Sequence, residues 1–241
     1  MSLIFSRNCL QSKNLLVLNL SRFYLKTSGI YIKAKLFMGI TAEEIKEQIP
    51  YYLTQEDKDE LVKALDSFPE KMNYYTARCQ DELLQGDGWN SLDIINIETA
   101  ERKSIKGIIL SNSCDISPEN RRDTPPSIVF APIIPLFLYE QLLARTGIDS
   151  KKISSKISSI KQQRVTSLFY LPKGGCLEAD YIAVLDDLHS LPAPRFYKKT
   201  DKRKEFTLSQ AGFYLFLLKL SMHFCRFHEE VFRGYEQQPT A

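Results

Sequence analysis

The chain has 241 residues and a mass of 27.8 kDa; 44 % of the residues are hydrophobic and 25 % are charged. This composition excludes a collagen-like, low-complexity or wholly disordered chain. No apolar run reaches the roughly 18 residues that a membrane-spanning helix needs, so no contact with a membrane is expected. The five cysteines are far apart and form no C-x-x-C pair. Their spacing argues against a disulfide framework or a zinc site, and it favours a reducing compartment, the cytoplasm.

Charge divides the chain into three blocks. Residues 1–42 carry six basic and no acidic residues, residues 43–101 have a net charge of −10, and residues 102–241 have +7. The segment 1–37 has three interpretations. It is a disordered or non-native stretch upstream of a true start at Met38, a targeting segment, or a packed element. Patterns typical of a folded domain begin only after Met38.

Residues 38–85 are predicted to form an acidic helical segment. Thr41 and Glu44 have the spacing of a capping box, and Pro50 ends that helix. Thr54 begins a second helix, followed by acidic residues that suit the helix dipole. A third helix is expected over 74–84, and the glycines at 86 and 88 end it.

The remainder, 86–241, is predicted to be one α+β domain. It consists of a small, strongly curved sheet or a barrel of Src-homology-3 type, flanked by helices and followed by a long C-terminal helix. The expected strands are 92–97, 107–111, 127–134, 165–171 and 181–185. The expected helices are 136–145, a helix capped by Asp149 with an apolar stripe at Ile153, Ile157 and Ile160, and 208–231 with a capping box at Thr207 and Gln210 and Gly234 after its end. A basic loop is expected over 195–205.

Residues 86–135 resemble the MazF/PemK family of toxins. The matching features are the pair Gly86-Asp87 before the first strand, Trp89, the strand Ile108–Ser111, which matches the family's L-V-L-S, and Ala131–Ile134, which matches its Pro-x-Thr strand. The resemblance implies the barrel and metal-free cleavage of single-stranded RNA. The family's catalytic Arg and Thr positions hold Lys106 and Ile134, so cleavage by the family's route is not expected. The stretch 111–116 (S-N-S-C-D-I) also resembles uncharacterised bacterial proteins associated with phage resistance.

A polar stripe on the terminal helix offers other catalytic groups. Lys219, His223 and Arg226 follow one another at spacings of four and three, so they share one helix face. His223 could act as acid or base and Arg226 could stabilise charge, with Lys219 on a phosphate. The alternative is the solvated side of an amphipathic helix.

Basic residues elsewhere suggest a nucleic-acid footprint. The candidates for contact with nucleic acid are Lys106, Arg121, Arg122, Arg164 and Lys219, supported by a Lys-rich helix at 151–164 and by the segment 195–205, which has six basic and two acidic residues. Phe196, Tyr197 and Phe206 could stack on unpaired bases. The alternative is that these lysines only serve solubility.

Cys114 and Asp115 directly follow a predicted buried strand. Cys114 is a possible nucleophile if a histidine approaches it in space. The alternative is a small buried cysteine beside an Asp that caps the turn. For a metal, the only close grouping of ligand types is Asp186, Asp187 and His189, which also reads as a turn, and no metal is expected. No nucleotide-binding motif is present and no cofactor is expected.

These observations leave three hypotheses. The first is a MazF-like, RNA-interacting protein of toxin or phage-defence type, with catalysis as a metal-free endoribonuclease left open. The second is a non-catalytic protein-binding or regulatory module, whose partner is another protein, an antitoxin or a second copy in a homodimer. The third is a Cys-dependent hydrolase.

Overall fold

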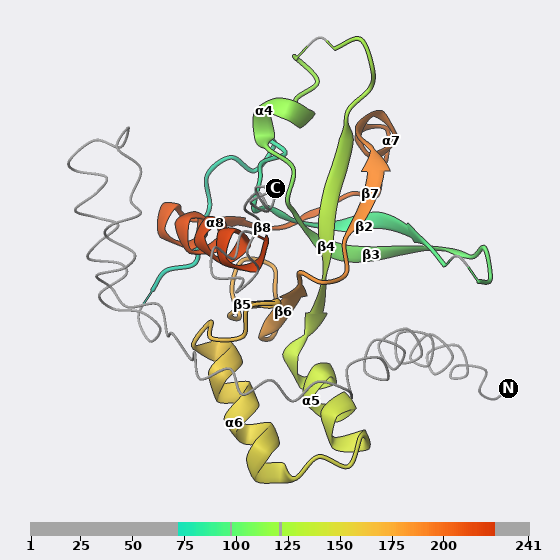
Figure 1. Ribbon diagram of the computed structural model, residues 1–241. Coiled ribbons are helices and arrows are strands. Elements are labelled where there is room, and N and C mark those ends of the chain that lie inside the picture. Colours follow the sequence, from blue (N-terminus) through green and yellow to red (C-terminus); the bar gives the residue numbers. More distant parts are fainter. Residues whose placement is uncertain (1–71, 97, 121, 225–241) are drawn as a thin grey trace, which may run out of the picture.

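The structure is a computed structural model that describes residues 72–96, 98–120 and 122–224 (Figure 1). The strands are β1 (Tyr75–Thr76), β2 (Gly88–Ile95), β3 (Arg102–Ile109), β4 (Ser127–Pro135), β5 (Leu168–Leu171), β6 (Tyr181–Val184), β7 (His189–Pro192) and β8 (Lys204–Leu208). The helices are α4 (Ser113–Ile116), α5 (Leu136–Arg145), α6 (Ser150–Lys161), α7 (Ala193–Tyr197) and α8 (Gln210–Phe224). None of these helices is long and apolar enough to span a bilayer.

All the strands belong to one antiparallel sheet that curls strongly on itself. Their order is β1-β8-β2-β3-β4-β6-β5, and β7 pairs with the first half of β4. The segment after β5 turns back toward β8 and β1, where the Cys176 amide donates to the Glu205 carbonyl at 2.8 Å and the Tyr75 hydroxyl donates to the Pro172 carbonyl at 2.6 Å. The expectation of an α+β fold with a strongly curved sheet, flanking helices and a helix near the C-terminus is thus confirmed.

Three apolar clusters hold the helices to the sheet. Under α8, the rings of Phe169 and Phe216 lie 5.2 Å apart. Next to α7, the rings of Trp89 and Phe196 meet edge to face at 5.5 Å. The third cluster packs α5 and α6 against β5 and β6, and Ile160 is completely buried in it. The second of these clusters supports the candidate site, because it fixes α7 against β2.

Agreement with the expected elements between 88 and 161 is uneven. Strands β2 and β3 begin four and five residues before the expected positions 92 and 107, and each ends two residues early. Strand β4 and helix α5 begin and end within a residue of the expected positions, and α6 begins after the expected Asp149 cap, whose carboxylate accepts the Lys151 amide at 3.0 Å. Of the expected stripe on α6, Ile153 and Ile160 are buried. The helices expected at 41–50 and 54–68, the segment 1–37 and the end of the terminal helix lie outside the described residues.

Three further expectations were wrong. Residues 74–84 do not form a helix. Tyr75 lies in β1 and pairs with Leu208 of β8, and the centroids of the Tyr75 and Phe206 rings are 5.2 Å apart. These tertiary contacts override the helical pattern of the sequence. The segment 195–205 is not one loop, because it begins in α7 and ends in β8. Likewise, α8 begins two residues after the expected start, since Ser209 caps it by accepting the Gly212 amide at 3.1 Å.

Lys219 is the most unusual residue of α8, because its side chain is buried and not solvated. Its residue is 1 % exposed, and its Nζ donates to the Gln163 carbonyl at 2.6 Å. Gln163 has a left-handed backbone (φ +57) just after the end of α6, where carbonyl groups carry partial negative charge. The expected surface stripe on α8 is therefore wrong at Lys219, and the lysine joins α8 to the end of α6.

Burial of Lys219 predicts how stability changes with pH. Burial lowers the pKa of Lys219 from 10.5 to about 7. Between these values the unfolded chain binds more protons than the folded one, so the free energy of unfolding rises with pH, by up to about 1.4 kcal/mol per pH unit. Burial also raises the pKa of Tyr74 to about 12, so stability falls again above pH 10.

We expect Lys219→Met to abolish the rise between pH 7 and pH 9 and to be more stable than the native chain near pH 6. Urea unfolding across this range measures the effect. Lys152→Met, at an exposed position on the same helix pair, is the control and should keep the native profile. A native profile in Lys219→Met would contradict the assignment.

Candidate anion-binding site

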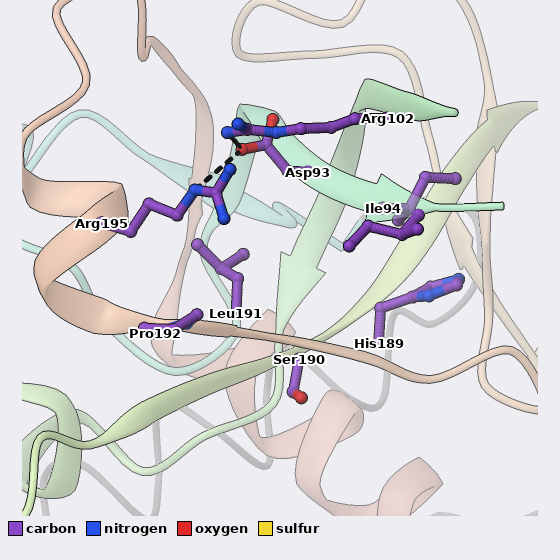
Figure 2. A pocket seen from close by; sticks show the side chains of 9 residues that line it. Asp93, Ile94, Arg102, His189, Ser190, Leu191, Pro192 and Arg195 are labelled. Carbon is purple, nitrogen blue, oxygen red and sulfur yellow. Dashed lines mark hydrogen bonds and ion pairs between the residues drawn. The ribbon is translucent and has the colours of Figure 1, made fainter. Parts of the chain in front are cut away.

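A pocket of about 260 Å³ opens where β2, β3, β7 and α7 meet (Figure 2). The two cationic walls come from opposite sides: Arg102 from the start of β3 and Arg195 from α7. Asp93 of β2 lies between them. The residues that line this pocket, called the Asp93 pocket below, are Asp93, Ile94, Ile95, Arg102, His189, Ser190, Leu191, Pro192 and Arg195.

A β-bulge next to the pocket holds its loop in place. The register between β2 and β3 shifts between Trp89 and Leu92, and Ser91 has a left-handed backbone (φ +57). The Ser91 hydroxyl donates to the Asp201 carboxylate at 3.1 Å, and the Ser91 carbonyl accepts from the Lys199 ammonium at 2.6 Å. The bulge thus fixes the loop after α7 against β2. A strained residue that anchors a loop is common beside functional sites.

The carboxylate of Asp93 is shared among several donors. Oδ1 accepts from Lys199 at 2.6 Å and from the Ser104 hydroxyl at 2.7 Å. Oδ2 pairs with the Arg102 guanidinium and lies 3.8 Å from Nε of Arg195. Burial alone would raise the pKa of Asp93, but hydrogen bonds from Arg102, Lys199 and Ser104 lower it to about 2. The carboxylate is therefore ionised at every physiological pH.

The charges at the pocket do not balance. Three cations surround one carboxylate, which leaves a net charge of +2 before any ligand binds. The Lys199 side chain is 12 % exposed and already bonds to Ser91, Asp93 and Ser104, so it serves to neutralise the carboxylate. The side chains of Arg102 and Arg195 are 46 % and 47 % exposed, and the excess charge lies on them. Figure 2 shows both guanidinium groups converging on Asp93.

His189 lies on another wall of the pocket. Its Nε2 is 3.0 Å from the Asp187 carboxylate, and its ring stacks on Phe130 with centroids 5.7 Å apart. The carboxylate and the aromatic ring together fix the imidazole plane.

The structure does not place the two residues expected to be catalytic in this pocket. His223 is not among the lining residues; its Nε2 lies 3.2 Å from the Asp186 carboxylate, and its side chain is 11 % exposed. Arg226 lies outside the described residues. Lys106 forms an ion pair with buried Glu205 at 2.7 Å, and Lys219 is buried in the core, so neither is a free cation for a phosphate.

The expected nucleic-acid footprint is not one surface. Arg164 is exposed at the end of α6, which lies at the opposite end of the molecule from α7 (Figure 1). Arg122 forms an ion pair with Asp115, and Arg121 lies outside the described residues. The aromatic residues expected to stack on bases are also unsuitable, because Phe196 and Phe206 are buried. Tyr197 is half-buried, and its hydroxyl donates to the Ile116 carbonyl at 2.9 Å.

Cys114 is exposed in the short helix α4, contrary to the alternative of a buried cysteine. Asn112, and not Asp115, caps this turn, because its side chain accepts the Cys114 amide at 2.9 Å. Within the described ranges we find no contact between Cys114 and a histidine; His189 and His223 pair with carboxylates elsewhere. The same residues contain no group of three or more His, Cys, Asp or Glu that could hold a metal ion.

Sequence reasoning did not single out Asp93 or Arg102. The sequence feature that could have indicated Asp93 is its place in the apolar, β-prone run Leu92-Asp93-Ile94. A carboxylate that is buried when such a strand packs needs a cationic partner. Arg195 and His189 were noted in other contexts, as part of the basic segment and of the turn. Scans for a known family and for similar curated proteins gave no match to this chain.

We expect Asp93→Asn to lower the free energy of unfolding at pH 7 by about 2 kcal/mol, because the largely buried Lys199 ammonium loses its charged partner. The stabilisation by Asp93 is present above pH 3.8, the ordinary pKa, and is lost as the pH falls to about 2. The difference between native and variant chains should therefore shrink from pH 4 to pH 2 in urea unfolding.

The matched control is Asp123→Asn, at an exposed position, which should leave stability unchanged. If the free energies of unfolding of Asp93→Asn and the native chain differed by the same amount down to pH 2, the charge of Asp93 would not be what stabilises the fold.

Proposed function

We propose that this protein binds single-stranded RNA through its phosphate groups, with the Asp93 pocket as the contact. One observation carries the proposal: Arg102 and Arg195 come from distant segments to line one pocket, and Asp93, the carboxylate in that lining, is already paired with Lys199. Guanidinium groups bind phosphate oxygens with two parallel hydrogen bonds, so a pair of them suits a phosphate well.

A further cation beside α7 extends the contact along a strand of RNA. Lys198 is exposed directly after α7, three residues after Arg195. Since the aromatic side chains near α7 are buried or half-buried, binding uses the backbone of the nucleic acid and not stacking on its bases. A flexible single strand can bend one phosphate into a pocket, which suits it better than a stiff duplex.

The choice of RNA, the barrel of Src-homology-3 type and the role in a toxin or phage-defence system rest on the resemblance of residues 86–135 to MazF/PemK proteins. Growth arrest on expression of the full chain, absent for Arg102→Gln, tests the toxin role. The alternative of a protein-binding module, including a homodimer, is favoured by Phe137 and Leu138 on α5, which are 50 % and 41 % exposed.

We expect Arg102→Gln and Arg195→Gln each to weaken binding of a short single-stranded RNA by about tenfold. Each should also reduce the slope of log affinity against log salt by about 0.7, the value for one lost contact to single-stranded nucleic acid. Fluorescence anisotropy at several salt concentrations measures both quantities. Lys199 still pairs with Asp93 in both variants, so the fold should persist.

Arg145→Gln and Arg164→Gln are the controls, because both residues are exposed on α5 or just after α6, far from the pocket. They should bind like the native chain. Equal losses in all four variants would mean that binding follows overall charge, and no binding by the native chain would favour the protein-binding alternative.

The pocket also determines where bound RNA would be cut. Metal-free cleavage needs a base for the 2′-hydroxyl and a cation for the charge that develops on phosphorus. His189 and the two arginines line the same pocket, whereas His223 lies outside it. Within the proposal, the acid–base role passes from His223 to His189.

If the purified chain cleaves RNA, His189→Ala should reduce the rate by about a hundredfold or more, typical of the loss of an acid–base group. His223→Ala should leave the rate within about threefold, because it removes no group from the pocket. Cleavage is measured on a labelled RNA, with circular dichroism to confirm folding. A large loss in His223→Ala and none in His189→Ala would assign the acid–base role to His223 on α8.

A further inference from the structure

We infer that the Asp93 pocket selects the terminal phosphate of a nucleic acid, a phosphate monoester, over the internal phosphodiesters of the strand. This inference rests on the proposed function and specifies which phosphate the pocket receives. It follows from the charge of the pocket, from its size and from the chemistry of its walls.

The charge of the pocket matches a monoester better than a diester. Lys199 neutralises Asp93, so Arg102 and Arg195 together leave an excess charge of +2. A phosphate monoester carries about −1.5 to −2 near pH 7, whereas an internal phosphodiester carries about −1. Only the monoester cancels this excess, and an internal phosphodiester would leave about one positive charge uncompensated.

The two guanidinium groups are close enough for one phosphate to bridge them. Both reach the same oxygen of Asp93: Arg102 pairs with Oδ2, and Nε of Arg195 is 3.8 Å from it. The Arg195 contact is at the outer limit of an ion pair, so this side chain keeps donors for an incoming ligand. A terminal phosphate has three free oxygens and can accept from both arginines at once.

The size of the pocket favours an end of the strand. Its volume of about 260 Å³ is below the roughly 300–1,000 Å³ of pockets that enclose drug-sized ligands. It can therefore enclose a phosphate and part of one attached sugar, so a strand end fits more completely than an internal phosphate, whose second sugar stays outside. Asp93 has a side chain only 8 % exposed, and Leu191 is buried, so the pocket is closed behind the phosphate.

The remaining walls contact sugar and do not read a base. Ile94, Ile95, Leu191 and Pro192 offer apolar surface for the sugar carbons. Apart from its charged residues, the lining offers the polar side chains of Ser190 and of His189, which already pairs with Asp187; these are too few for the hydrogen-bond pattern that distinguishes one base from another. Selection by the pocket is therefore independent of the terminal base.

The test compares one RNA sequence in three forms: with a 5′-phosphate, with a 3′-phosphate, and with hydroxyl groups at both ends. Each carries an internal fluorophore and is titrated with the full chain by anisotropy. We expect at least one phosphorylated form to bind about tenfold more tightly than the hydroxyl form, and the two arms show which end is recognised. Nucleoside monophosphates of all four bases should compete about equally, and nucleosides should not compete.

Arg102→Gln and Arg195→Gln should each reduce the preference for the phosphorylated form to about twofold or less, while Arg145→Gln should retain it. If the three RNA forms bind equally and Arg102→Gln still weakens all of them, RNA binding stands and the terminal-phosphate inference is overturned. If no RNA form binds, the proposed function itself fails. Equal or better competition by a phosphoserine peptide would overturn the assignment to nucleic acid.

Discussion

The ion pair between Asp93 and Lys199 is the interaction on which the candidate site depends. It joins residues 106 positions apart and brings the segment after α7 onto strand β2. The edge-to-face contact between Trp89 and Phe196 adds an apolar link between β2 and α7. The same carboxylate positions Arg102, and through α7 it sets where Arg195 points. One buried charge therefore arranges two exposed ones, and its own charge is cancelled by a third cation.

The basic segment 195–205 shows that counting charges in a sequence overstates how many of them are free. Its cations are largely used inside the protein: Lys199 binds Asp93, Arg203 binds Glu205 at 3.1 Å, and Lys204 binds Asp87 at 2.8 Å. Lys202 donates to two backbone carbonyls near the end of α7. What remains for a ligand is Arg195 and Lys198. The sequence of this segment suggests a broad basic surface, but most of its cations form ion pairs or hydrogen bonds within the protein, and Arg195 and Lys198 remain exposed.

The buried carboxylates explain why β8 escaped prediction. Lys204 and Glu205 lie side by side in a strand that is buried along its whole length. Both charges are tolerated because each has an opposite charge nearby, Asp87 for Lys204, and Lys106 and Arg203 for Glu205. Burial raises the pKa of Asp87, and the Lys204 contact partly offsets this effect. Propensity and periodicity cannot see such partners, because they are distant in sequence and close only after folding.

The elements that sequence did predict share a different property. Strand β4 and helices α5 and α6 are defined by local patterns: an apolar run bounded by Pro135, and the Asp149 cap with its apolar stripe. Strands β1 and β7 and helix α7 are two to five residues long and exist because a neighbour pairs with them or packs on them. Five of the nine residues that line the Asp93 pocket come from β7 and α7. The fold class of the protein could therefore be predicted from the sequence, whereas the pocket could not.

The residues of β3 that carry the resemblance to MazF/PemK proteins are not the residue of β3 that lines the candidate site. Lys106 and Arg102 are four residues apart on β3, about 13 Å along an extended strand. Lys106, at the family's Arg position, is neutralised by Glu205, and Ile134, at its Thr position, is buried in the core with α5 and α6. Arg102 also pairs with a buried carboxylate, but three cations surround Asp93 whereas two surround Glu205, so a phosphate at Arg102 meets the larger excess of positive charge. The electrostatics of this chain thus favour the outer end of β3, next to α7, over the positions that the resemblance indicates.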